Sequence, residues 1–113
     1  MNPETIKTII AISKHETANY TSKVFRQNHN LFGMREPRKR STLATGTNLF
    51  HATYNSIEDS FKDWLLWWQM HGVTIQMLDN MSYVQMVTYM KGKAYFTDSF
   101  TNYLNGVKYY YNA

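Results

Sequence analysis

The chain has 113 residues, a formal net charge of +4 and no cysteine. This length suits one domain with a modest core, and the lack of cysteine excludes disulfides and thiol catalysis. Four histidines are scattered without a paired spacing, so we expect no metal and no cofactor. No run approaches the roughly 18 apolar residues of a membrane span, and the N-terminus lacks the pattern of a secretory signal. The positive charge favours an anionic partner: a cell-wall polymer, lipid headgroups or nucleic acid.

Residues 2–16 are predicted to form a helix, because Asn2 suits the N-cap and Pro3 the first helical position. Isoleucines recur in it at helical spacing, at Ile6, Ile9 and Ile10. Glu16 falls in the last turn, where the helix dipole, together with partial burial under neighbouring aromatic rings, would raise the pKa of its carboxyl group. A protonated carboxyl group can donate its proton to a leaving oxygen, as glycoside cleavage requires. Glu16 is therefore the predicted catalytic acid.

A short second helix is expected next, capped by Thr21 or Ser22, with Val24 and Phe25 as its buried pair. It should end in the polar turn at residues 28–30, which brings the following segment near the end of the first helix.

The sequence then turns sharply at Gly33, which permits a backbone angle that a side chain would forbid. Asn30 can close this turn through its own backbone. Phe32 either plugs the core beneath the turn or lines the cleft beside the catalytic acid.

Residues 35–54 are predicted to form a β-hairpin or a mobile loop. The turn signal lies at residues 45–48, Thr-Gly-Thr-Asn, while Leu49 and Phe50 suit a short strand. The basic run at residues 35–40 is interpreted as a solvated loop, which suits anionic glycan strands or teichoic-type polymers. Nucleic-acid binding is not expected from so short a run.

Ser56 and Asp59 resemble a capping box and open the central core helix, which should run to about His71. Its apolar stripe consists of Ile57, Phe61, Trp64, Leu65 and Trp68. Asp63 is expected on the solvated face of this helix, and no catalytic role is predicted for it.

Two further helices complete a mainly α fold. The first is predicted over residues 80–91, and the second begins after a cap at Thr97 or Asp98. Their buried faces are expected to consist of Val84, Val87 and Met90 in the first helix and Phe100, Tyr103, Leu104 and Val107 in the second. Tyr95 lies in the short connection between them, from which a side chain can project into a cleft.

Four segments together resemble the bacterial endo-β-N-acetylglucosaminidase family, which includes flagellum-associated muralytic enzymes. They are SKHETANYTS at 13–22, NLFGM at 30–34, FHATYNSIEDSF at 50–61 and GKAYFTDSFTNY at 92–103. The resemblance spans nearly the whole chain. It implies one lysozyme-like domain over residues 1–113, an α+β fold that is mainly helical, with a short hairpin or loop beside an active-site groove.

The resemblance also implies a function, a peptidoglycan hydrolase of the N-acetylglucosaminidase type that acts on the cell wall as a monomer. Lack of a signal peptide fits a phage-encoded lysin, a module cut from a larger protein, or a chain that is exported by another route. Glu16 would be the proton donor, Tyr95 and Asn30 would orient or polarise the sugar, and Phe32 and Tyr54 would bind substrate.

A second carboxylate is the open point of the mechanism. Glu36 is the only acidic residue between Glu16 and the core helix, and its neighbours Arg35 and Arg38 would hold it ionised. Without it, the N-acetyl group of the substrate can act as internal nucleophile. A lytic transglycosylase, a muramidase and a non-catalytic wall-binding or virion structural module on the same fold are the alternatives.

Overall fold

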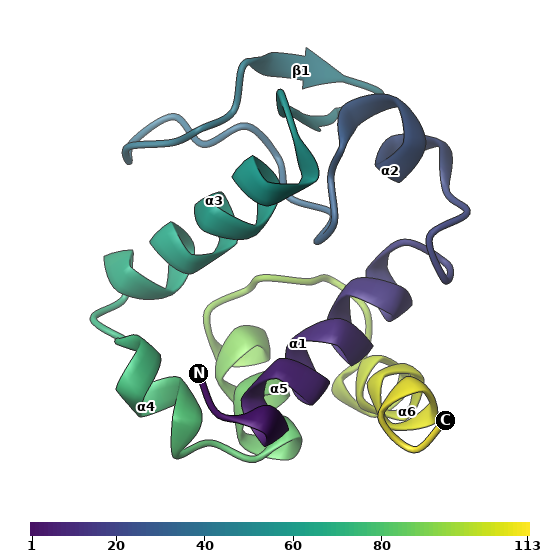
Figure 1. The fold of residues 1–113 in the computed structure, drawn as a ribbon, viewed down its shortest axis with the longest axis vertical. Coiled ribbons are helices and arrows are strands. Elements are labelled where there is room, and N and C mark those ends of the chain that lie inside the picture. The colour runs from purple at the N-terminus through teal and green to yellow at the C-terminus, as the bar shows by residue number, and fades with distance from the viewer. The chain divides into compact units, whose positions relative to one another are not determined.

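The computed structural model describes all residues, 1–113, and the chain divides into two compact units. The first unit holds residues 1–15 and 75–113, and the second holds residues 16–74. Six helices and one two-stranded sheet make up the fold, which confirms the prediction of a mainly α protein with a short hairpin (Figure 1). None of the helices combines the length and apolar character needed to cross a membrane.

The first unit is entirely helical. It contains most of α1 (Pro3–Glu16), together with α4 (Ile75–Asp79), α5 (Tyr83–Gly92) and α6 (Phe100–Tyr111), of which α5 and α6 pack against each other (Figure 1). Asn2 caps α1 as predicted, since its side chain accepts a hydrogen bond from the backbone N–H of Thr5 at 2.8 Å. The buried apolar side chains of this unit are Ile9, Ala11, Ile12, Leu78, Met86, Val87, Met90, Tyr103 and Val107.

Several predictions for this unit need correction. The short helix α4 was not predicted, and α5 begins after Ser82, which forms a capping box with Gln85. Ser99 caps α6 in place of Thr97 or Asp98. Val84 is 40% exposed, because Met86 occupies the buried face of α5 with Val87 and Met90.

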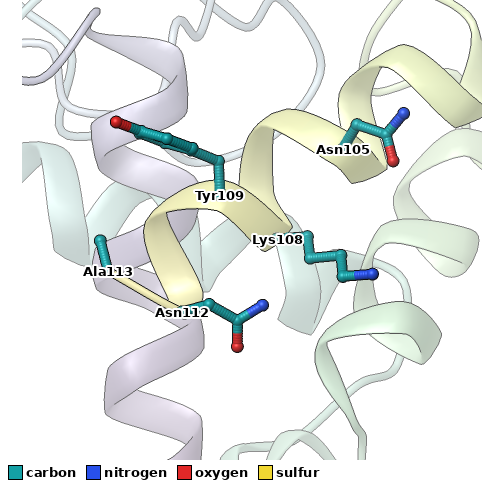
Figure 2. A pocket seen from close by; sticks show the side chains of 5 residues that line it. All are labelled: Asn105, Lys108, Tyr109, Asn112 and Ala113. Atoms are coloured by element: carbon teal, nitrogen blue, oxygen red, sulfur yellow. The ribbon is translucent and has the colours of Figure 1, made fainter.

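A shallow depression lies at the C-terminal end of α6 (Figure 2). Five residues line it: Asn105, Lys108, Tyr109, Asn112 and Ala113. It contains one cation and no carboxylate side chain, so it lacks the acid that glycoside cleavage needs.

The second unit contains α2 (Lys23–Asn28), the hairpin of β1 (Gly46–Asn48) and β2 (His51–Thr53), and α3 (Ile57–Met70). The strands are antiparallel, with Asn48 opposite His51 as the last pair before the turn. The turn is therefore Leu49-Phe50, and the prediction of a turn at residues 45–48 is wrong. Ser22 caps α2 as predicted, but Val24 and Phe25 are only half-buried, and the buried residue of that helix is Asn28.

Helix α3 supplies the core of the second unit. Ser56 caps it by accepting a hydrogen bond from the N–H of Asp59 at 3.1 Å, as predicted. Trp64 and Trp68 are fully buried, whereas Ile57 is 44% exposed and Leu65 is half-buried. The buried face is thus rotated from the predicted stripe: besides the two tryptophans it includes Ser60, Asp63 and Trp67.

Candidate functional site

Glu16 ends α1, as predicted, and its half-exposed side chain belongs to the second unit. Its carboxylate lies directly against the backbone of Gly33. A Cβ atom at Gly33 would overlap Oε2 of Glu16, and the φ angle of Gly33 is +66°, in the left-handed region. The left-handed backbone angle therefore favours glycine at this position, and a side chain there would force the Glu16 carboxylate to shift.

A left-handed turn follows Glu16 at once. Ala18, Asn19 and Tyr20 have φ angles of 50°, 57° and 66°, although none is glycine. The buried Thr17 holds this turn, because its hydroxyl oxygen accepts a hydrogen bond from the N–H of Tyr20 at 2.8 Å. Consecutive left-handed residues are strained, and strain of this kind concentrates at functional sites.

Asn30 closes the sharp turn that contains Gly33. Its amide nitrogen donates to the carbonyl oxygens of Met34 and Ala52, both at 2.9 Å. Its amide oxygen accepts from the N–H groups of Phe32 at 3.3 Å and Met34 at 3.2 Å. The side chain is 1% exposed. The predicted contact of Asn30 with a sugar is corrected to a positioning role, because its hydrogen-bonding groups are used inside the fold.

Phe32 is the core plug of the same turn. It is 1% exposed and stacks on Trp64, with ring centroids 4.6 Å apart and an interplanar angle of 15°. Of the two alternatives for Phe32, packing in the core beneath the turn is the one that fits. The predicted contact of Phe32 with substrate is corrected, because its ring is not exposed to solvent.

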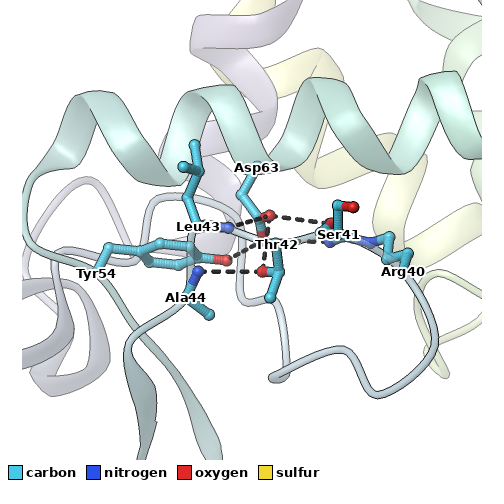
Figure 3. Close-up of polar contacts among 7 residues, drawn as sticks. All are labelled: Arg40, Ser41, Thr42, Leu43, Ala44, Tyr54 and Asp63. Carbon is cyan, nitrogen blue, oxygen red and sulfur yellow. Dashed lines mark hydrogen bonds and ion pairs between the residues drawn. The ribbon is translucent and has the colours of Figure 1, made fainter.

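Tyr54 also lies in the interior, where it joins a network around Asp63 (Figure 3). The Tyr54 hydroxyl donates to Oδ2 of Asp63 at 2.6 Å. Arg40 donates to both carboxylate oxygens, at 2.9 and 3.2 Å. Oδ1 also accepts from the Thr42 hydroxyl at 2.8 Å and the Leu43 N–H at 3.1 Å. Tyr54 therefore supports the fold instead of contacting substrate, and the prediction that Asp63 faces solvent is wrong.

The network also fixes the charges of its members. Burial alone would raise the pKa of Asp63, but hydrogen bonds from Arg40, Tyr54, Thr42 and the Leu43 backbone outweigh it and lower that pKa. Burial raises the pKa of Tyr54, and the hydrogen bond to Asp63 adds to the effect. Asp63 is thus an ionised structural anchor. Arg40, the last residue of the basic run, pairs with it instead of lying in a solvated loop.

Glu36, the predicted second carboxylate, is exposed on the segment beside the hairpin. Its Oε1 accepts a hydrogen bond from the hydroxyl of Thr47 in β1 at 2.7 Å. Glu36 forms no ion pair with Arg35 or Arg38, the neighbours expected to hold it ionised. Its role as a base stays a prediction.

Tyr95 belongs to the first unit, in the connection between α5 and α6, and is half-buried. Its backbone N–H donates to the Met90 carbonyl at 2.9 Å, and Ala94 before it adopts a left-handed φ of 56°. This geometry ends α5 and turns the chain at Tyr95. Its predicted role toward the sugar stays a prediction.

No group of three or more His, Cys, Asp or Glu side chains in the chain is arranged to hold a metal ion. No protein-family model, curated protein or solved structure matches this chain.

Proposed function

We propose that this chain is a peptidoglycan glycosidase of the N-acetylglucosaminidase type, with a lysozyme-like fold and Glu16 as its general acid. The supporting observation is the contact between Glu16 and Gly33. It joins the two most specific segments of the resemblance, the one that carries Glu16 and the Asn-Leu-Phe-Gly corner.

The contact suits proton donation. Glu16 is half-buried, and the Gly33 backbone limits the orientations of its carboxyl group. In this proposal the glycosidic oxygen approaches the part of the residue that stays in contact with solvent. Behind it, Asn30 and Phe32 fix the corner from inside the fold. A positioned acid protonates the leaving oxygen as the bond to the sugar breaks.

The attacking group has two candidates. Glu36 is exposed and could activate water, or the N-acetyl group of the substrate could attack from within. Two other acids of the second unit are less suitable, since Asp63 is buried in its network and Glu58 pairs with Lys62.

A lytic transglycosylase is the second candidate function. It needs a single acid and no attacking water, and the commitment of Asp63 to Arg40 and Tyr54 favours a mechanism that uses few carboxylates.

Mass spectrometry of digested peptidoglycan tests the proposal, with a Glu16→Gln variant as the control. Reducing-end N-acetylglucosamine is the expected product. Reducing-end N-acetylmuramic acid would instead identify a muramidase, and anhydro-muramic ends would identify a transglycosylase. Intact wall after incubation with the parent protein would refute an enzyme and leave a wall-binding or structural module.

A further inference from the structure

The turn of the hairpin presents an aromatic ring to solvent. Phe50 is 85% exposed, the largest exposed fraction among the large hydrophobic residues of the chain, and its turn partner Leu49 is 39% exposed. A ring left in water contributes little to folding.

The backbone of this turn is strained as well. Leu49 and Phe50 have φ angles of 55° and 61°, so both central residues of a two-residue turn are left-handed. Asn and Gly are the residues that such turns favour, because other side chains meet steric penalties there. Two bulky apolar residues thus occupy the least suitable positions of the hairpin.

A clamp of polar side chains holds the strained turn. The amide nitrogen of the fully buried Asn28 donates to the Asn48 carbonyl at 2.7 Å, and its amide oxygen accepts from the Asn48 side chain at 2.9 Å. The Nδ1 atom of His51 lies 2.7 Å from the Leu49 carbonyl oxygen, to which it donates because a carbonyl only accepts. The tip is therefore fixed in place before any ligand arrives.

A second set of hydrogen bonds connects the hairpin with the turn beside the candidate acid, within one unit. Asn30 donates to the Ala52 carbonyl in β2, and the turn that it closes contains Gly33, against which the Glu16 carboxylate lies. The hairpin that carries Phe50 is thus hydrogen-bonded to the turn against which the Glu16 carboxylate lies.

Backbone strain is concentrated in this unit. Seven residues other than glycine have positive φ angles: Ala18, Asn19, Tyr20, His29, Leu49, Phe50 and Ala94. All except Ala94 belong to residues 16–74, the unit of Glu16. Strain of this kind clusters at functional sites, and in this unit it occurs both directly after Glu16 and at the hairpin tip.

We propose that Phe50 is a sugar-stacking subsite for the glycan strand that Glu16 acts on, an inference that rests on the proposed function. One ring matches the apolar face of one pyranose. Polar groups surround the tip, with Asn48 exposed before it and His51 half-exposed after it, as a hydroxyl-rich ligand requires. A protein partner or a membrane would need more apolar surface than Leu49 and Phe50 provide.

Binding is measured in the Glu16→Gln background, so that the glycan is not cut. The probes are a hexamer of β-1,4-linked N-acetylglucosamine, titrated by NMR, and insoluble peptidoglycan, followed by co-sedimentation. Phe50→Ala should weaken binding about tenfold, whereas Phe50→Trp keeps a stacking ring and should retain it. Tyr109→Ala is the matched control, because that aromatic residue is 70% exposed in the other unit, and binding should not change.

A double variant separates binding from folding. Leu49→Asn combined with Phe50→Gly supplies the residues that the turn prefers, so its melting temperature should rise while glycan binding falls as in Phe50→Ala. If the Glu16→Gln protein binds glycan and adding Phe50→Ala leaves that binding unchanged, the stacking subsite is refuted and the proposed function is not. A parent protein that neither binds nor cuts glycan would overturn the proposed function and this inference together.

Discussion

The carboxylate of Glu16 lies against the backbone of Gly33, in space that any other residue at position 33 would fill with its Cβ atom. The carboxylate of the candidate acid can therefore take this orientation because residue 33 is a glycine and has no side chain. Gly33 has a second requirement, its left-handed φ of +66°, so one substitution would disturb the backbone and the carboxylate together.

Gly33→Ala should lower both stability and wall clearing. The left-handed angle and the overlap with Oε2 together should cost about 2 to 5 kcal/mol of unfolding free energy, unless Glu16 moves away. If Glu16 does move, stability is partly recovered and activity is lost instead. Denaturant unfolding and turbidity clearing of purified walls measure the two effects.

Gly72→Ala is the control for that experiment. Gly72 also has a left-handed φ, +78°, but a Cβ there would meet nothing within 4 Å. It should cost only the backbone strain, about 1 to 2 kcal/mol, and leave the rate of clearing unchanged among folded molecules. Equal effects of the two substitutions would argue against a functional contact between Gly33 and Glu16.

Asp63→Ala should be strongly destabilising, by about 3 to 5 kcal/mol, because it leaves the guanidinium of Arg40 and the hydroxyl of Tyr54 without their partner. Lys62→Ala is the matched control on the same helix. It breaks the exposed pair of Lys62 with Glu58 and should cost below about 1 kcal/mol. Urea unfolding of both variants tests the difference, and similar losses would contradict an anchoring role for Asp63.

Lowering the pH should remove the stabilisation that the ionised Asp63 carboxylate gives to the folded protein. Its pKa is lower in the folded chain, so its stabilisation is complete above the unfolded pKa of about 3.9 and is lost as pH falls through the folded pKa. The melting temperature of the parent protein should therefore exceed that of Asp63→Asn near pH 6, and the gap should narrow below about pH 4. A gap that stays constant down to pH 2 would show that Asp63 does not titrate with folding.

Local rules predicted the beginnings of the helices better than their buried faces. Asn2, Ser22 and Ser56 cap their helices as the sequence indicates, since capping depends on atoms within a few residues. Asp63 was misplaced because a charged residue in an apolar helix is assigned to solvent by default. Its partner Arg40 lies 23 residues away, in a segment with no periodic pattern.

The pattern did hold a signal for Asp63, which shares a helical face with Ser60 and Trp67.

The hairpin turn offered no such signal. Gly46 fits a turn by local preference, but the clamp of Asn28 on Asn48 decides the register, and Leu49 and Phe50 must then bear the strain. At the candidate site, the position of Glu16 on its helix was predictable, whereas the burial of Phe32 was one of two open alternatives.

Trp64→Ala should cost about 3 to 5 kcal/mol, a large part of the stability of a small domain. Trp64 is fully buried in α3 and stacks on Phe32, so its removal leaves a cavity beneath the corner. Met70→Ala, at a position on α3 that is 52% exposed, should change the unfolding free energy by less than about 1 kcal/mol. If Trp64→Ala lowered the unfolding free energy by less than roughly 1 kcal/mol, Trp64 would not be a core residue.

Glu16→Gln should separate activity from stability. Glutamine keeps the shape of the side chain but cannot donate a proton to a glycosidic oxygen, so wall clearing should fall at least about 10²- to 10⁴-fold. Folding should persist, because the neutral isostere still fits against Gly33 and removes a carboxylate from the negative end of α1; the melting temperature should stay unchanged or rise slightly. If Glu16 had a structural role instead, the Glu16→Gln variant would lose stability and activity together. Turbidity clearing and a melting curve on both proteins decide between these outcomes, and a variant that clears walls at the parent rate would exclude Glu16 as the acid.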